Sequence, residues 1–347
     1  MPRCISPVPD TSSTDPVAAA KLRRRSLVRG ATVAAGVAFI VGALTALQSR
    51  INGELAVATT SGVQAAVVSF GTGWILLTVV LALSPAMRTG LRTVIRDLRE
   101  GALRWWQVAG GVLGGFFVAV QSVTVPVIGV AIFTVAVVAG QVTNSIVVDR
   151  IGLGPAGRQP VTFARVASAI LALTAVAVAV SDRLGPSASS AVIPVIVALT
   201  AGLAIAVQQA INGRVGAAAH NAWTATWLNF TLGTVMLGAV LGLAWGLTDL
   251  DPGPLPAGPW WLYLGGSIGV LFIAAATWIV QRLGVLLFAL LTITGQLSGA
   301  LMLDWIAPAA DVEVQITLVV GVAIAGLAVL VGSLSSWAPR LGRAVSH

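Results

Sequence analysis

The sequence predicts an all-α polytopic membrane protein with about ten transmembrane helices, arranged as two inverted five-helix repeats. Three observations predict this fold: the composition, a series of long uncharged stretches, and a set of motifs that occurs twice. Hydrophobic residues make up 57% of the 347 residues and charged residues only 9%, whereas about 25% of the residues of soluble domains are charged. A chain with so little charge is expected to lie in a lipid bilayer.

Ten stretches are long and apolar enough to cross the hydrocarbon core, which takes about 20 residues in a helix. They are continuously apolar rather than alternating, which predicts helices and not a barrel. The stretch from Trp105 to Val148 is uncharged and too long for one crossing, and Pro126 and Gly129 mark the turn that divides it. The predicted spans lie near residues 31–49, 62–84, 107–124, 128–148, 162–181, 191–211, 223–247, 260–281, 284–303 and 315–335.

The basic residues predict the orientation, because they gather on the cytoplasmic side of membrane proteins. If the N-terminus is cytoplasmic, only Arg50 and Arg183 of the 20 lysines and arginines fall on the other side. We therefore expect a multi-pass protein of the cell (inner) membrane with both termini cytoplasmic, a disordered basic tail over residues 1–30 and a second tail over 336–347. The net charge of +8 is attributed to contact with anionic lipid headgroups and not with nucleic acid.

The two halves of the chain share a set of motifs. At an offset of 160 residues the matching pairs are Gln48/Gln208, Ile51/Ile211, Asn52/Asn212, Gly53/Gly213, Phe70/Phe230 and Gly73/Gly233. At an offset of 155 residues they are Trp105/Trp260, Trp106/Trp261, Gly110/Gly265, Gly111/Gly266, Gly114/Gly269, Gly140/Gly295, Gln141/Gln296 and Asp149/Asp304. One shift of five residues in a loop reconciles the two offsets, so the motifs predict an internal repeat.

The repeats are expected to have opposite orientations. Each of them, over residues 31–185 and 186–335, contains five predicted spans, and an odd number of crossings returns the chain on the other side. The charges agree, since the arginine-rich loop after the second span corresponds to residues 249–259, which carry two aspartates and no basic residue. Inverted repeats with a binding site at their interface are a recurring architecture of secondary transporters.

The repeated motifs also resemble a known family. The Gln and Ile-Asn-Gly at the end of the first span of each half, the Phe-x-x-Gly of the next, the Trp-Trp before the third and the Gly-Gln…Asp of the fourth resemble the YdcZ-like branch of the drug/metabolite transporter superfamily. The resemblance covers about residues 31–335 and implies a candidate bacterial inner-membrane exporter. The halves differ where Gln121 aligns with Ala276 and Asn144 with Gly299.

Amide side chains within the spans are the candidate site residues. A polar group in a membrane helix is costly without a partner, so it tends to face the bundle interior. The residues predicted to line a substrate cavity are Gln48, Asn52, Gln141, Gln208, Asn212 and Gln296. Two alternatives stay open: the amides hold the helices together by hydrogen bonds, or the Asn-Gly steps end their helices.

The distribution of carboxylates predicts a neutral cavity. None of the twelve acidic residues lies in the middle of a predicted span. Glu54, just after the first span, is the nearest to the predicted cavity and is the carboxylate to test for proton coupling, although its repeat counterpart is Arg214. The favoured interpretation of Glu54 and Arg214 is that they are two unrelated surface charges. The expected substrate is a polar solute that is uncharged or weakly cationic.

Other patterns indicate packing or topology rather than chemistry. The Gly-x-x-x-Gly pairs that begin at Gly110, Gly111 and Gly265 predict close helix contacts, and the tryptophan pairs predict interfacial anchors. The arginines between residues 88 and 99 predict a short amphipathic helix on the cytoplasmic surface or, alternatively, a solvated loop.

Enzymatic chemistry is not expected. Gly265-Gly-Ser-Ile-Gly269 has the letters of a nucleophile elbow, but the aligned segment has Val112 at the serine position. The glycines of residues 152–157 follow no strand, so they do not form a dinucleotide fingerprint. With one cysteine and two histidines, no catalytic, cofactor or metal site is predicted.

The sequence therefore favours a secondary transporter, and specifically an exporter, that works by alternating access between the two repeats. The alternative is a membrane scaffold or accessory subunit that transports nothing. The expected partners are a small-molecule substrate and the lipid bilayer, and a homodimer is left open.

Overall fold

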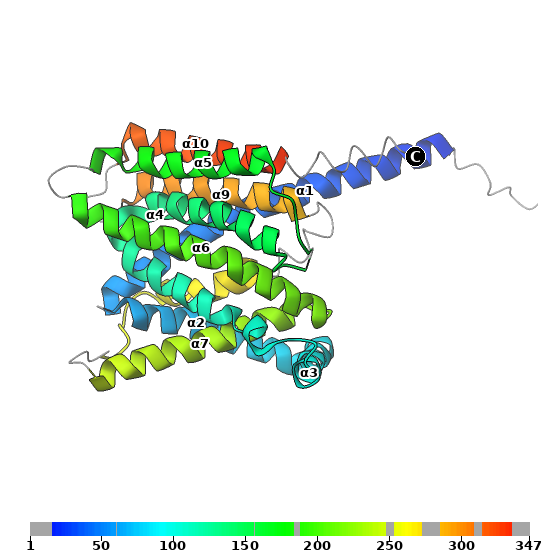
Figure 1. Ribbon diagram of the computed structural model, residues 1–347, viewed down its shortest axis with the longest axis horizontal. Coiled ribbons are helices and arrows are strands. Elements are labelled where there is room, and N and C mark those ends of the chain that lie inside the picture. Colours follow the sequence, from blue (N-terminus) through cyan, green and yellow to red (C-terminus); the bar gives the residue numbers. More distant parts are fainter. Residues whose placement is uncertain are drawn as a thin grey trace, which may run out of the picture.

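The computed structural model describes residues 16–59, 61–155, 157–183, 188–247, 253–272, 285–308 and 314–334, and this part of the chain is helical and without strands. The helices run side by side in layers, with α5 and α10 at one face and α2 and α7 toward the other (Figure 1). They are α1 (Pro16–Thr59), α2 (Gly62–Leu83), α3 (Pro85–Arg99), α4 (Gly110–Ile151), α5 (Phe163–Ala179), α6 (Ala188–Ala218), α7 (Ala222–Leu247), α9 (Val285–Ile306) and α10 (Ile316–Leu334), with short 3-10 turns η1 (Trp105–Val108), η2 (Ser181–Arg183) and η3 (Trp260–Tyr263).

The described helices agree with the ten-span prediction. Five of them are long and apolar enough to cross a membrane, and α4 among them holds two predicted spans. Helices α5 and α10 are shorter and apolar, and α9 matches the ninth predicted span. The eighth begins with η3 and is helical over residues 265–272, and its remainder lies outside the described residues.

Helix α1 extends beyond the predicted first span at both ends. It begins at Pro16, which corrects the expectation of a disordered tail for residues 16–30; the alanines, leucines and arginines of this segment are strong helix formers. Residues 1–15 and the predicted tail over 336–347 lie outside the described residues. At its other end α1 continues through the Asn-Gly step to Thr59, and α6 likewise continues to Ala218, so these steps do not end their helices.

Helix α4 holds the third and fourth predicted spans. Its 42 residues would measure about 63 Å as a straight helix, roughly twice the thickness of the hydrocarbon core. The backbone breaks at Gly129, where φ is 80° and ψ is 166°, a conformation that is open essentially only to glycine. The prediction that Pro126 and Gly129 divide this stretch is confirmed.

Each repeat packs its first helix against the fourth span of the other repeat. Helix α1 lies on α9, and α6 lies on the second part of α4. A Cβ atom at Gly42 would collide with the carbonyl of Thr292, and one at Gly202 would collide with the carbonyl of Val137. Residues 42 and 202 are related by the 160-residue offset and residues 137 and 292 by the 155-residue offset, so the two contacts are equivalent.

The second spans of the two repeats, on α2 and α7, contact each other near the centre through equivalent residues. The rings of Phe70 and Phe230 lie with their centroids 4.9 Å apart. A Cβ atom at Gly73 would collide with the ring of Phe230, and one at Gly233 would collide with the ring of Phe70. The two phenylalanines therefore mark the place where the repeats meet.

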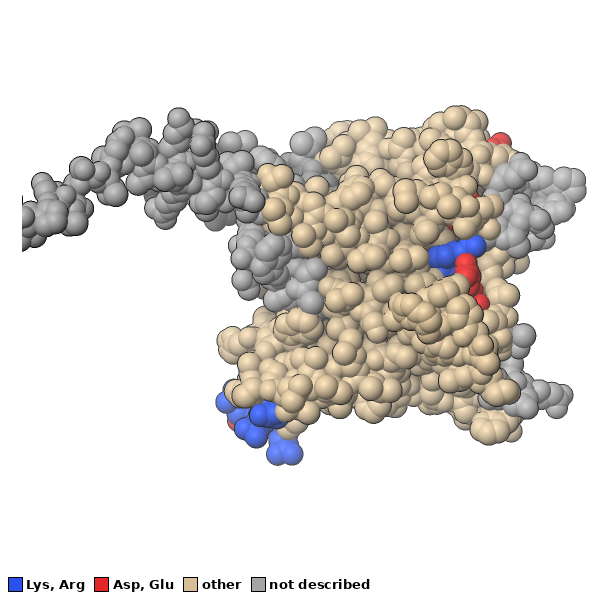
Figure 2. Space-filling model, turned by 180° about the vertical axis from the view of Figure 1, so that it is seen from behind, with Lys and Arg blue, Asp and Glu red and all other residues tan. Residues whose placement is uncertain are grey.

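The charged residues are gathered at the ends of the helices. Figure 2 shows basic side chains clustered at one end of the molecule, an acidic and a basic patch near the other end, and an uncharged surface between them. The basic cluster belongs to α3, whose residues Met87 and Val94 are 1% exposed while its arginines face outward. This confirms an amphipathic helix rather than a loop, and we call this the arginine-rich end.

Candidate functional site

A cavity of about 200 Å³ lies between the two repeats. We call it the amide cavity, because glutamine and asparagine side chains from both halves line it. Four of the six residues predicted to line a substrate cavity do so. The lining residues are Thr45, Gln48, Ser49, Phe70, Gly114, Phe117, Val118, Gln121, Val137, Gln141, Ile205, Gln208, Gln209, Asn229, Phe230, Gly269, Phe272 and Gln296.

The amide cavity lies near the middle of the helices that form it. Gln141 is about 18 Å along α4 from Gly129 and about 15 Å from the end at Ile151, at 1.5 Å per residue. Gln296 is about 17 Å from the start of α9 and about 15 Å from its end. Both glutamines therefore lie near the middle of the helical segments that carry them.

The glutamines of the cavity differ in their hydrogen bonding. The Gln141 amide donates to Oε1 of Gln209 at 3.0 Å, and the Gln208 amide donates to Oδ1 of Asn229 at 2.9 Å. No described residue hydrogen bonds to the side chains of Gln48 and Gln296, which are partly exposed to the cavity. These two side chains, from α1 and α9, retain their capacity to bind a ligand.

Asn52 and Asn212 lie beside the cavity and not on its wall. Asn52 is fully buried, and its amide donates to Oε1 of Gln121 at 2.6 Å. The Asn212 amide donates to Oδ1 of Asn229 at 3.0 Å. The two asparagines hold side chains that do line the cavity, which is the interhelical hydrogen bonding that the sequence left open as an alternative.

Gln121 and Asn229 are the central polar residues that the repeat pattern could not identify. Gln121 is 1% exposed; besides accepting from Asn52, it donates to Oγ of Ser49 at 2.6 Å. Neither residue has an amide at its counterpart position, which is Ala276 for Gln121 and Ser69 for Asn229. The available signal was that both are uncharged polar residues in the middle of a span.

Small residues on the third and eighth spans make room for the amides. A Cβ atom at Gly114 would collide with Nε2 of Gln208, and one at Gly269 would lie 3.1 Å from Nε2 of Gln48. The Gly-x-x-x-Gly pattern therefore does more than allow helices to pack. It leaves space for the side chains that face the cavity.

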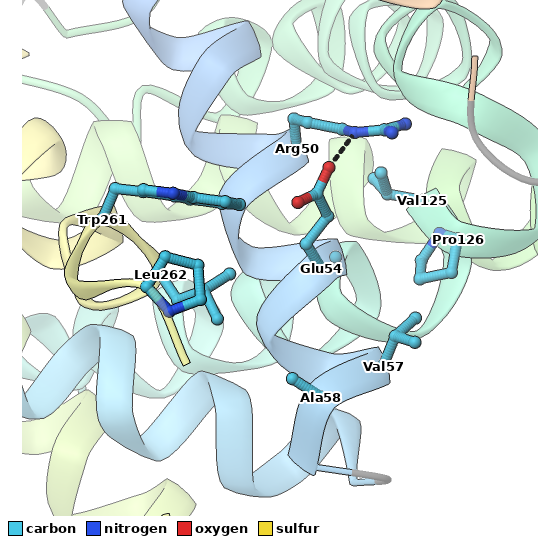
Figure 3. Close-up of a pocket in the computed structure, with 10 residues that line it drawn as sticks. Arg50, Glu54, Val57, Ala58, Val125, Pro126, Trp261 and Leu262 are labelled. Atoms are coloured by element: carbon cyan, nitrogen blue, oxygen red, sulfur yellow. Dashed lines mark hydrogen bonds and ion pairs between the residues drawn. The ribbon is translucent and has the colours of Figure 1, made fainter. Parts of the chain in front are cut away.

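Glu54 lies in a separate pocket at the end opposite the arginine-rich end, together with Arg50. The volume is about 460 Å³, and we call it the Glu54 pocket. Figure 3 shows Glu54 between Trp261 and Leu262 on one side and Val125 and Pro126 on the other. Its lining residues are Arg50, Gly53, Glu54, Val57, Ala58, Val125, Pro126, Pro259, Trp261 and Leu262.

The carboxylate of Glu54 is paired rather than free. It accepts from Nε of Arg50 at 2.6 Å, and its side chain is 37% exposed. Its repeat counterpart, Arg214, donates to the carbonyls of Leu153 at 2.5 Å and Gly152 at 2.6 Å. Glu54 does not line the amide cavity, so its effect on that cavity would be indirect.

The matched aspartates lie at opposite ends of the bundle. Asp304 is 1% exposed, and its two oxygens accept from the backbone N–H groups of Val130 at 3.0 Å and Ala131 at 2.7 Å. It thereby caps the helix that begins after the break in α4. Asp149 pairs with Arg165 at 2.7 Å, and not with its neighbour Arg150.

The electrostatics of the amide cavity are neutral, since none of the described residues that line it is charged. Its walls offer amide donors and acceptors, four phenylalanine rings and aliphatic groups. Within the described residues no cluster of three potential metal ligands occurs. The arrangement is suited to bind a small polar molecule by hydrogen bonds and ring contacts.

Comparison with protein families gives a match that covers both halves. Residues 33–178 and again residues 193–331 match the family described as "Putative inner membrane exporter, YdcZ". Comparison with curated proteins and comparison with solved structures each find no match. The matched regions coincide with the two predicted repeats and together span most of the chain. The chain therefore belongs to the YdcZ family, as its repeated motifs and its apolar helices indicate.

Proposed function

We propose that the chain is a secondary transporter that exports a small polar solute, uncharged or weakly cationic, by alternating access between its inverted repeats. The observation that carries this proposal is the amide cavity. Equivalent glutamines from both repeats face it, Gln48 with Gln208 and Gln141 with Gln296. A site built equally from two inverted halves can face either side of the membrane when the halves exchange conformations.

The hydrogen bonding supports a polar, uncharged ligand. The free amides of Gln48 and Gln296 each offer two donors and one acceptor. The described lining residues include no carboxylate that could pair with a fully charged cation. Desolvating an ion in such a cavity would be costly without a partner of opposite charge. A hydroxyl- or amide-bearing solute would exchange its water for these groups at little cost.

The orientation is part of the proposal. The arginine-rich end, with α3 and the arginines of residues 88–104, is placed in the cytoplasm together with both termini, in accordance with the positive-inside rule. The Glu54 pocket then opens toward the outside. Export would carry the solute from the arginine-rich end through the amide cavity to the opposite end.

The experiment that tests the site is solute flux into proteoliposomes with a panel of polar metabolites. Gln141→Ala and Gln296→Ala should each reduce flux by about five- to thirtyfold, since a lost hydrogen bond to a buried ligand costs about 1–2 kcal/mol. Asn144→Ala is the matched control: Asn144 lies one turn further along α4, outside the cavity lining, and donates to the carbonyl of Leu203. Normal flux in both glutamine variants would assign them to packing. No flux of any solute by the parent protein would favour a scaffold.

Energy coupling is tested separately. If the solute exchanges for a proton, Glu54 is the carboxylate that we propose to take it up, and flux driven by an imposed pH gradient should fall in Glu54→Gln while exchange without a gradient remains. Gradient-driven flux that is unchanged in Glu54→Gln would assign the coupling to another group. The exposed carboxylate of Glu100, replaced in the same way, serves as the control.

A further inference from the structure

The Glu54 pocket has the features of a ligand site of its own. Its volume of about 460 Å³ lies in the range of about 300–1,000 Å³ that is usual for small-molecule sites. Apart from one ion pair its described walls are apolar, and the indole of Trp261 lies on one side of Glu54 (Figure 3). The side chain of Glu54 is 37% exposed and that of Arg50 is 17% exposed, so the carboxylate is the more accessible partner.

Arg50 has a second acceptor within reach. Its Nη2 lies 3.5 Å from the carbonyl of Pro308, which follows the end of α9. The other repeat shows this interaction fully formed, because Arg214 donates to the carbonyl of Leu153 at 2.5 Å, and Leu153 is the counterpart of Pro308 at the 155-residue offset. Arg50 and Arg214 differ by one helical turn in register, so both guanidinium groups can reach the end of the facing helix.

The two charges of the pair are therefore not equivalent toward a ligand. A cation that binds Glu54 displaces Arg50 toward Pro308, where the guanidinium keeps an acceptor. An anion that binds Arg50 leaves Glu54 without a donor among the described residues. A buried or half-buried charge without a partner is costly, so the geometry favours a cationic ligand over an anionic one.

We infer that the Glu54 pocket binds organic monocations with an apolar body, the ammonium on Glu54 and the apolar part against Trp261, with Arg50 as the internal competitor. A cation near an indole face gains from the ring electrons, and the aliphatic walls exclude water from the rest of the ligand. This site is separate from the amide cavity. It requires no transport, so it does not rest on the proposed function.

The test is equilibrium binding of three probes of one shape to the purified full-length protein in nanodiscs. The probes are 2-phenylethylamine as the cation, 2-phenylethanol as the neutral analogue and phenylacetate as the anion, measured by calorimetry at pH 7. The cation should bind at least tenfold more tightly than either analogue. Glu54→Gln should remove this preference, and Trp261→Leu should weaken binding of the cation and of the alcohol alike.

Arg50→Gln gives a result of the opposite sign. Removing the internal competitor should tighten binding of 2-phenylethylamine several-fold, which loss of folding could not do. Glu100→Gln and Trp106→Leu, a carboxylate and a tryptophan at the arginine-rich end, are the matched controls and should bind like the parent. Equal binding of the three probes would indicate a pocket for lipid or detergent tails and overturn the inference. Tighter binding of phenylacetate, lost in Arg50→Gln, would overturn it in favour of an anion site.

Discussion

Asp149 and Asp304 occupy equivalent positions in the two repeats, yet their side chains have different surroundings. Asp304 is buried and bonded to two backbone N–H groups of α4. The side chain of Asp149 is 33% exposed and pairs with Arg165. The same sequence position thus fixes the two repeats to each other at one end of the molecule and holds a local ion pair at the other end.

The amides differ between the repeats in a similar way. In the first repeat Asn52 is held by Gln121, on the third span. In the second repeat Asn212 and Gln208 are held by Asn229, on the seventh span. Gln121 and Asn229 each stand at a position where the other repeat has no amide side chain. The comparison teaches that the repeats preserve their packing and vary their polar contacts, as expected if the two ends of the bundle have different roles.

The largest expected effect concerns the inversion itself. After Cys4 is replaced, a cysteine at Pro254 should react completely with a membrane-impermeant thiol reagent in intact cells, whereas one at Thr93 should react only after the membrane is opened. The two positions lie in corresponding parts of the repeats on opposite sides of the predicted membrane. The reverse labelling pattern would invert the orientation, and labelling of both positions from one side would break the inverted repeat.

The two aspartates should differ in their contribution to stability. Asp304→Ala should lower the free energy of unfolding by about 3–5 kcal/mol, because it leaves two buried backbone donors without an acceptor. Asp149→Ala should cost about 0–1 kcal/mol, as for other partly exposed ion pairs. Thermal unfolding of the detergent-solubilised protein measures both, and Asp304→Asn, which keeps one acceptor, should lie between them. Equal losses would mean that the two environments do not differ in energy.

Replacing the central amides, Gln121 and Asn229, should lower the free energy of unfolding less than replacing Asp304, and by a similar amount in the two repeats. Gln121→Ala and Asn229→Ala should each cost about 1–3 kcal/mol, since each leaves buried polar groups unpaired. Adding Asn52→Ala to Gln121→Ala should cost less than the sum of the single changes, because the two residues share one hydrogen bond. Strict additivity, measured by the same unfolding experiment, would show that this contact contributes nothing.

The equivalent glycine contacts should respond alike. Gly42→Ala and Gly202→Ala each place a methyl group against a backbone carbonyl of the facing helix and should destabilise the protein by about 1–3 kcal/mol. Gly36→Ala is the control, since nothing lies within 4 Å of a Cβ atom there, and a helical alanine should stabilise the protein by up to about 1 kcal/mol. A large difference between Gly42→Ala and Gly202→Ala would mean that the packing of the repeats is not equivalent.

Much of this fold could be predicted from the sequence, because hydropathy and charge determine where a chain crosses a bilayer. The repeat offsets also predicted which residues are equivalent, including Gln141 with Gln296. Periodicity could not predict which helices of the two repeats meet. The reach of Asp304 to Val130 joins residues 174 positions apart and depends on how α9 packs against α4, and the Asn-Gly steps remain helical because tertiary contacts override the local tendency of these residues to end a helix.

The break at Gly129 has a mechanical consequence. The part of α4 before it lies against α7, where Gly111 contacts the backbone of Asn229, and the part after it lies against α6, where Gly140 contacts the backbone of Leu199. Gly129 alone therefore connects two separately packed helical segments, which we call the two rods of α4, without any intervening linker. If the rods pivot relative to each other, the backbone angles of Gly129 must absorb most of the rotation, so a reporter peptide inserted at this residue would disconnect the two movements even where both rods still fold.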